Sequence, residues 1–153
     1  MAYYTKVLQT GEIVRYAGKL HWIVYKRAIL SAVVTGGAVL AFQWRPEGLD
    51  SVAMAVDLTL LTVTLYLCCA AWIQRVTTEI VVTDRRIIHK VGWMSRRTQE
   101  INITKVETVD VQQGIVGRIL DFGTVGIKGV GGSWEPLQKI DAPLALRNAI
   151  VVG

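Results

Sequence analysis

Cysteine and histidine, the residues that most often bind transition metals or act as nucleophile and base, are scarce: the 153 residues include two of each. Cys68 and Cys69 are adjacent in one apolar segment, where helical side chains would point about 100° apart and could not comfortably form a disulfide. His21 and His89 lie far apart, and neither has ligand spacing around it. We therefore predict no metal site and no cofactor, and interpret the cysteines as small apolar residues.

Other patterns that enzymes need are also missing. The glycines at 123, 126 and 129 do not fit G-x-G-x-x-G, and no Gly-Lys-Ser/Thr follows, so a nucleotide loop is not expected. Ser133 lacks the glycine two residues later that a nucleophile elbow requires, because that position is Glu135. No dense basic run is interleaved with aromatics, which disfavours nucleic acid as a partner. The sequence predicts no catalytic residues and no enzymatic activity.

Two long apolar runs, residues 28–44 and 52–73, stand near the start of the chain, seven residues apart. As helices they would span about 25 and 33 Å, which brackets the roughly 30 Å hydrocarbon core of a bilayer. Lipid offers no hydrogen-bond partners, so a helical hairpin satisfies the backbone at that depth. The alternative is a buried hairpin in a soluble protein, but the remaining residues could hardly cover two such runs. A transmembrane hairpin is therefore predicted over residues 28–73.

Charge beside the runs predicts the orientation of the hairpin. Five Lys/Arg precede the first run, whereas the connection 45–51 has one arginine against Glu47 and Asp50. The positive-inside rule then places both termini in the cytoplasm. No cleavable signal peptide is recognised, because the polar, basic stretch before Lys26 is too long for an n-region. The aromatic residues near the ends of the runs suit the headgroup region, and they are Trp22, Tyr25, Trp44 and Trp72.

From Thr77 onward the pattern changes to short alternating segments separated by turn residues, which predicts a small antiparallel β domain. Asp141, with a proline two residues later, is a helix-start signal, and Leu146, Ala149 and Ile150 fall on one face of the helix that follows. Three regions are predicted: an N-terminal cytoplasmic or interfacial segment 1–27, the hairpin 28–73 and a cytoplasmic domain 74–153. The expected strands are residues 79–83, 86–91, 98–103, 106–112 and 124–128.

Four blocks stand in order in this domain: V-T-D-x-R-I-I at 82–88, G-W-x-S-R-R-T-x-E-I at 92–101, K-V-x-x-V at 105–109 and G-R-I-L-x-F-G-T-V-x-I at 117–127. Together they resemble the bacterial pleckstrin-homology-like (PH-like) domain found behind one or two helices in small bacterial membrane proteins. The GEIV at 11–14 also resembles the family's lead-in to its first helix. The resemblance implies a bent, seven-strand antiparallel sandwich closed by a C-terminal helix, in a multi-pass protein of the bacterial inner membrane.

Within the hairpin, two features could carry binding. Asp57 is the one ionisable side chain inside either run. Its carboxylate either reaches the headgroups at the outer end of its helix or forms a polar contact with a partner helix. Thr64 lies on the same helix face and would belong to that contact. Ala28, Ala32 and Gly36 form a stripe of small residues that permits close helix approach, within the hairpin or to another protein.

In the domain, the turn 92–97 is the predicted recognition surface, because a hairpin turn would ordinarily be polar and this one contains Trp93 and Met94. The alternative places Trp93 beneath the terminal helix, with the arginines as a solvated face. A basic rim around an exposed aromatic suits a membrane surface or a protein partner. The rim residues are Arg85, Arg86, Arg96 and Arg97.

The absence of reaction chemistry, two membrane passes and a small domain held near the bilayer favour a non-catalytic accessory or scaffold protein. Its domain would present a surface to a second copy of the chain or to a larger membrane protein complex. The alternative function is a lipid sensor in which the basic turns bind the anionic headgroups of the membrane.

Overall fold

The structure is a computed structural model that describes residues 11–42, 50–92, 97–130 and 132–151. The chain divides into two compact units, each described by itself below. The hairpin unit is residues 22–74, and the β unit combines residues 1–21 with residues 75–153.

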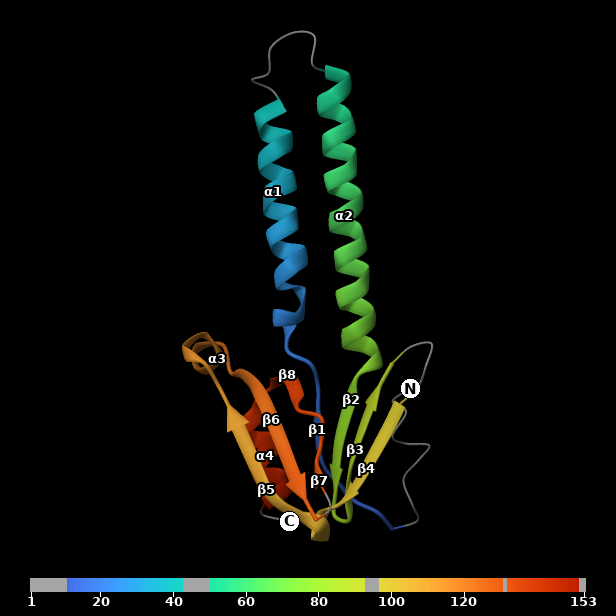
Figure 1. Ribbon diagram of the computed structural model, residues 1–153, viewed down its shortest axis with the longest axis vertical. Helices are drawn as coiled ribbons and strands as arrows, with labels where there is room; N and C mark the ends of the chain where they lie inside the picture. The colour runs from blue at the N-terminus through green and yellow to red at the C-terminus, as the bar shows by residue number, and fades with distance from the viewer. Residues whose placement is uncertain (1–10, 43–49, 93–96, 131, 152–153) are drawn as a thin grey trace. The chain divides into compact units, whose positions relative to one another are not determined.

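The hairpin unit consists of two long helices (Figure 1), α1 at Lys26–Phe42 and α2 at Asp50–Thr77, with a 3₁₀ turn, η2, at Trp22–Tyr25 before α1. Both helices are long and apolar enough to cross a membrane. Only 17% and 6% of their most apolar windows are buried, unlike the core helices of a soluble protein. The predicted helical hairpin is thus present, although α2 continues four residues beyond the predicted end at residue 73.

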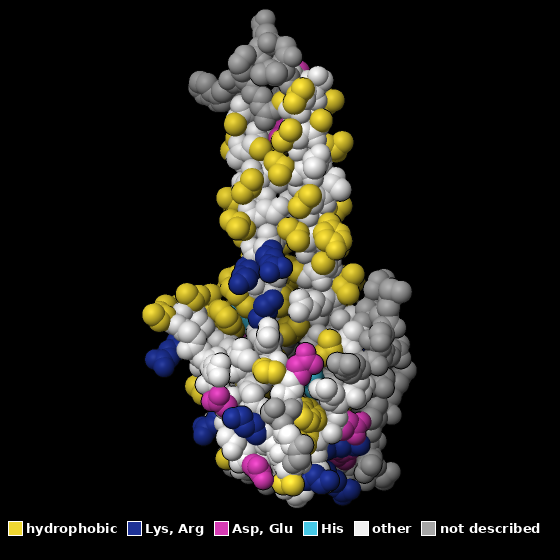
Figure 2. Space-filling view, viewed as in Figure 1, with side chains coloured by type: hydrophobic (Ala, Val, Ile, Leu, Met, Phe, Trp, Pro, Cys, Tyr) yellow, Lys and Arg dark blue, Asp and Glu magenta, His cyan; other side chains and the backbone are white. Residues whose placement is uncertain are grey.

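A narrow seam joins α1 to α2. Between residues 53 and 71, the covered residues of α2 alternate four and three apart, the spacing of a coiled-coil seam. Two hydrogen bonds cross the seam: Ser31 Oγ lies 2.7 Å from Thr64 Oγ1, and Thr35 Oγ1 lies 3.0 Å from it. The outward faces are covered by exposed aliphatic side chains, as the yellow surface of the helices in Figure 2 shows. The covered positions are 24 in η2, then 28, 31, 35 and 38 on α1, and, between residues 53 and 71 of α2, 53, 57, 60, 64, 67 and 71.

The first sheet of the β unit has the order β1–β2–β3–β4, and every pair is antiparallel. Its first strand comes from before the hairpin, because Gly18 in β1 pairs with Ile80 in β2. The sequence sets residues 1–27 apart as a separate segment, and the structure corrects this boundary by joining β1 to the domain. The strands are β1 Val14–Gly18, β2 Glu79–Thr83, β3 Arg86–Val91 and β4 Arg97–Asn102.

The second sheet is built around β6, which pairs with β5, β7 and β8. Helix α4 packs against both sheets and buries Leu146 and Ile150 completely or nearly so, which confirms the predicted capping helix. The PH-like sandwich expected from the resemblance is present, and it consists of seven longer strands, the two-residue β7 and α4. The elements are η3 Ile103–Lys105, β5 Val106–Gln112, α3 Ile115–Ile119, β6 Phe122–Gly129, β7 Gly132–Ser133, β8 Leu137–Asp141 and α4 Pro143–Val151.

The core lies between the two sheets and α4 and consists of aliphatic side chains. Burial of this kind contributes about 1.5–3 kcal/mol per large aliphatic side chain and holds the sandwich together. One close approach explains a glycine of β6, because a Cβ at Gly129 would lie 2.5 Å from the carbonyl oxygen of Lys105. The side chains below 2% exposure include Ile80, Val82, Ile87, Val125, Ile127, Ile140 and Leu146.

Candidate functional site

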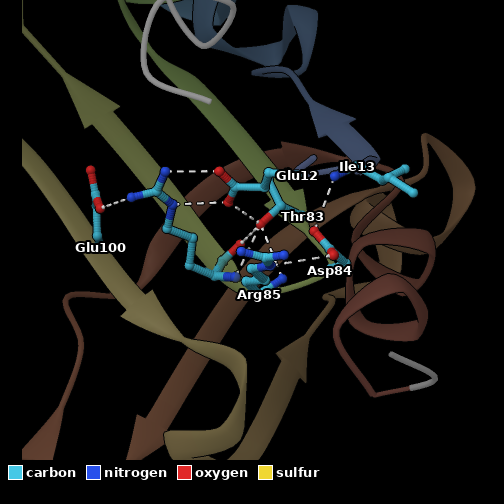
Figure 3. A network of polar contacts seen from close by, with 7 residues as sticks. Glu12, Ile13, Thr83, Asp84, Arg85 and Glu100 are labelled. Atoms are coloured by element: carbon cyan, nitrogen blue, oxygen red, sulfur yellow. Dashed lines mark hydrogen bonds and ion pairs between the residues drawn. The ribbon is translucent and has the colours of Figure 1, made fainter. Parts of the chain in front are cut away.

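A buried ion pair joins the segment before the hairpin to the β2–β3 turn after it (Figure 3). Arg86 donates from Nη2 to Glu12 Oε2 at 2.8 Å and from Nε to Glu12 Oε1 at 2.9 Å, a bidentate pair. The Glu12 side chain is fully covered, and the Arg86 side chain is 17% exposed. The other guanidinium nitrogen of Arg86 donates to Glu100 Oε2 at 2.8 Å on β4. We call Glu12, Thr83, Asp84, Arg86 and Glu100 the latch.

Thr83 and Asp84 complete the latch. Thr83 Oγ1 accepts a hydrogen bond from the Arg86 backbone N–H and lies 2.8 Å from Glu12 Oε1. The Asp84 carboxylate accepts from the Ile13 N–H at 3.0 Å, while the Asp84 N–H donates to the Ile13 carbonyl at 3.1 Å. Side-chain hydrogen bonds to Glu12 raise the pKa of the Arg86 guanidinium, against the opposing effect of burial. The latch therefore fixes the N-terminal segment to the turn that follows β2.

This network corrects part of the predicted basic rim. Arg86 is paired with two carboxylates and is largely covered, whereas Arg85 is 57% exposed and lies 3.7 Å from Asp84. Arg86 and Val91 are the two ends of β3, about 17 Å apart for five steps of about 3.3 Å. Arg97 pairs with Val91. Arg85 and Arg86 therefore lie at the opposite end of β3 from Val91, the residue that pairs with Arg97.

The predicted recognition turn itself is bounded but not described. Trp93, Met94 and Arg96 lie outside the described residues, and of Arg97 only the backbone is described, as the first residue of β4. The register describes the strands on either side of the turn, since Lys90 of β3 pairs with Thr98 of β4. The role of the turn stays a prediction.

In the hairpin, the structure places Asp57 and Thr64 on the covered face of α2, as the sequence spacing predicts. Thr64 is the polar centre of the seam, because Ser31 and Thr35 both lie within hydrogen-bond distance of its hydroxyl. Such bonds between membrane helices contribute about 0.6 kcal/mol on average, and up to about 1.7. The sequence interpretation found Thr64 but missed Ser31 and Thr35.

The small-residue stripe is divided by the structure. Ala28 is buried, at 6% exposure, whereas Ala32 and Gly36 are exposed. A Cβ added at Gly36 would meet no atom within 4 Å. Ala32 and Gly36 follow Ala28 at intervals of four residues, whereas the seam repeats every 3.5 residues, so these two positions turn away from α2. The expected close approach of the two hairpin helices through this stripe is therefore wrong. Its use toward another protein stays a prediction.

An open groove of about 950 Å³ lies on the β unit beside α3. Its polar residues include Gln112, Gln113, Arg118, Asp121 and Thr124, a set without a nucleophile next to a base. Among the described residues no group of three or more His, Cys, Asp or Glu could hold a metal ion.

Comparison with known proteins identifies the family. Residues 24–150 match the bacterial PH domain family, a span that contains both long helices, strands β2 to β8 and most of α4. No match is found among curated proteins or among solved structures. The matched span covers more than half of the chain and agrees with the sandwich and its capping helix, so the chain belongs to the bacterial PH domain family.

Proposed function

We propose that this protein is a non-catalytic accessory or scaffold protein of the bacterial cytoplasmic membrane. The hairpin crosses the bilayer, both termini are cytoplasmic, and the PH-like domain presents a surface for protein interaction or oligomerisation. Membership of the bacterial PH domain family supports the coarser part, since such domains are lipid- or protein-interaction modules and are generally non-catalytic.

The observation that carries the proposal is the insertion of the hairpin between two paired strands. The β1 strand ends three residues before η2, and β2 begins after a single residue, Thr78, beyond α2. Since β1 and β2 are neighbours in one sheet, both ends of the hairpin must lie on the same side of the membrane. Two short connections and the latch therefore hold the domain beside the bilayer, where it can reach other membrane proteins but cannot leave.

The predicted recognition turn gives the proposal its test. The full chain is extracted from its own membranes in a gentle detergent, and its mass and co-eluting proteins are compared between wild type and Trp93→Ala. We expect a complex larger than one chain that Trp93→Ala weakens by about 2 kcal/mol or more, the range of an interfacial anchor. Recovery of the wild-type chain as a single copy without a partner would refute the scaffold role. Unfolding of Trp93→Ala would assign the ring to the core instead.

A second candidate function, an anionic-lipid sensor, is favoured by the exposed cations Lys26 and Arg27 in the first turn of α1. Lipid recognition through these charges should weaken steeply as salt rises, because exposed charges are screened. An experiment that separates the two functions measures how much lipid the purified chain retains while the phosphatidylglycerol content and the salt concentration are varied. Selective, salt-sensitive retention supports the sensor, and retention that is indifferent to both excludes it.

A further inference from the structure

Helix α3 presents aliphatic side chains to the outside of the β unit. Ile115 is 82% exposed, Val116 is 57% exposed and Ile119 is 77% exposed. On an ordinary surface helix the apolar side chains would face the core, whereas the buried residue of α3 is Gly117. We call Ile115, Val116 and Ile119 the α3 wedge. Clustered exposed aliphatics of this kind mark a contact surface rather than scattered surface residues.

The wedge is held in place by the chain around it. A Cβ at Gly117 would lie 2.6 Å from the carbonyl oxygen of Phe122, so only glycine lets α3 lie this close to β6. The Gln113 side-chain amide lies 3.3 Å from the carbonyl oxygens of both Gly117 and Phe122. These contacts fix the covered face of α3, and the wedge projects as a preorganised surface.

The wedge lies at the end of the β unit from which the chain leaves toward α1. The ring of Phe122, three residues after α3, stacks on the His21 ring with centroids 5.1 Å apart. Phe122 also pairs with Asp141, whose N–H donates to the Lys19 carbonyl at 3.1 Å. His21 is the residue directly before η2 and the first apolar helix. The wedge therefore lies at the same end of the β unit as His21, the last residue of that unit before the hairpin.

We propose that the α3 wedge inserts into the interfacial region of the same bilayer that the hairpin crosses, as a third membrane contact of the protein. The inference rests on the proposed function, because it needs the hairpin to be in the membrane. The exposed Arg118 on the same helix can keep its guanidinium at the phosphates while its aliphatic stem lies in the interface. The occupant is lipid, not a protein, because the short connection 19–21 brings lipid to this end of every copy.

The attachment is apolar and not electrostatic. Near the wedge, the exposed cations Lys19 and Arg118 are matched by the exposed carboxylates Asp121 and Asp141. A surface with balanced charge gains little from anionic lipid, whereas salt does not screen the burial of aliphatic side chains. Insertion of the wedge should therefore be insensitive to salt, unlike contacts made by the sensor function.

The test measures the depth of three positions in the full chain, reconstituted into phosphatidylethanolamine and phosphatidylglycerol vesicles. Cys68 and Cys69 are replaced by alanine, and one cysteine at a time, at Ile119, Val130 or Leu65, carries an environment-sensitive fluorophore. Val130 is the matched control, since it is an aliphatic residue with 70% exposure in the β6–β7 turn at the opposite end of β6. Leu65 is 64% exposed on α2 and reports insertion of the hairpin. Quenching is measured with lipids that carry a doxyl group near the glycerol backbone or deep in the acyl chain.

We expect the Ile119 probe to be blue-shifted and quenched by the shallow doxyl lipid, at low and at high salt, while the Val130 probe stays in water. If Leu65 is quenched by the deep doxyl lipid but Ile119 emits as in water, the wedge does not insert and the inference fails alone. A blue-shifted Ile119 probe that neither doxyl lipid quenches would mean that a protein covers the wedge, which also overturns the inference. If Leu65 is not quenched, the hairpin is not in the bilayer and the proposed function fails with it.

Discussion

The hairpin unit and the β unit distribute polar and apolar side chains in opposite ways. In the hairpin, the hydroxyls of Ser31, Thr35 and Thr64 lie along the covered seam, and aliphatic side chains cover the outside. In the β unit, Ile, Val and Leu fill the interior and charged residues spread over the surface, as Figure 2 shows. Each unit thus places on its outside the groups that suit one solvent, lipid for the first and water for the second.

The β unit has two exceptions to its own rule. The β unit buries a charged pair, Glu12 with Arg86, and exposes the α3 wedge. The hairpin carries a carboxylate, Asp57, on its covered face. The latch holds together segments on both sides of the hairpin, and the wedge lies at the end where the chain leaves the domain.

The largest expected effect comes from separating β1 from the β unit. A fragment of residues 76–153 lacks β1 and the Glu12 partner, which uncovers β2 and leaves Arg86 without its buried carboxylate. We expect this fragment to aggregate or remain unfolded. A chain in which a flexible linker replaces the hairpin, joining residues 1–21 to 78–153, should fold as a soluble domain. Near-ultraviolet circular dichroism and gel filtration distinguish the two, and a folded, monomeric 76–153 would show that β1 is dispensable.

Breaking the latch should have the next largest effect. Arg86→Met leaves the Glu12 carboxylate covered and without its bidentate partner, so we expect a loss of about 3–5 kcal/mol in the free energy of unfolding. The matched control is Arg85→Met, where the side chain is 57% exposed, and its effect should be within about 0.5 kcal/mol of zero. Urea denaturation of the hairpin-deleted domain measures both.

A double variant identifies the origin of that loss. Glu12→Leu together with Arg86→Met removes both charges, and we expect it to recover a large part of the stability that Arg86→Met loses. Equal losses in Arg85→Met and Arg86→Met would mean that the pair contributes nothing particular.

A smaller effect tests the polar seam of the hairpin. Thr64→Val removes the hydroxyl that Ser31 and Thr35 approach, and it should reduce the stability of the helix pair by about 0.6–1.7 kcal/mol. Thr62→Val is the matched control, because Thr62 is exposed and its hydroxyl donates to its own helix at the Leu58 carbonyl. Reversible unfolding in mixed detergent micelles compares the two. Similar stability of both variants would remove the seam as a source of helix association.

The smallest expected effect is a pH dependence in the β unit. Burial lowers the pKa of His89, although Glu135 and a hydrogen bond with Gln99 act in the opposite direction. The folded state then binds the proton less readily than the unfolded state. Its stability should be full above about pH 6.5 and fall as the pH drops toward the lowered pKa. In the hairpin-deleted domain, His89→Gln should flatten this part of the stability profile, and an unchanged slope would assign it to other groups.

Local patterns predicted much of the fold. Strands 79–83, 86–91 and 106–112 agree with the structure residue for residue, because alternation and turn residues are short-range signals. The β1 strand was missed because its partner β2 lies more than sixty residues away. The β8 strand was missed because its buried residues, Leu137 and Ile140, are three positions apart and so do not alternate as in a regular strand. The pairing of β8 with β6 is irregular between these two residues.

The candidate sites were harder to predict for the same reason. Glu12 and Arg86 are 74 residues apart, so no local pattern relates them, and the one available signal was that both stand in blocks that resemble the family. Helix α3 has five residues and an outward apolar face, which neither length nor periodicity can reveal. Register placed Arg85 and Arg86 at the other end of β3 from Arg97, although the sequence suggested a single rim.

The central claim is that the hairpin crosses the membrane and leaves both of its ends, with the β unit, in the cytoplasm. It is tested most directly by thiol labelling in intact cells, with Cys68 and Cys69 replaced and a single cysteine at Gly48 or at the exposed Lys128. A membrane-impermeant reagent should modify the cysteine at position 48, and it should modify the cysteine at position 128 only after the cells are opened. Labelling at position 128 but not at 48 in intact cells would contradict the orientation, and labelling of neither or both before opening would contradict the crossing.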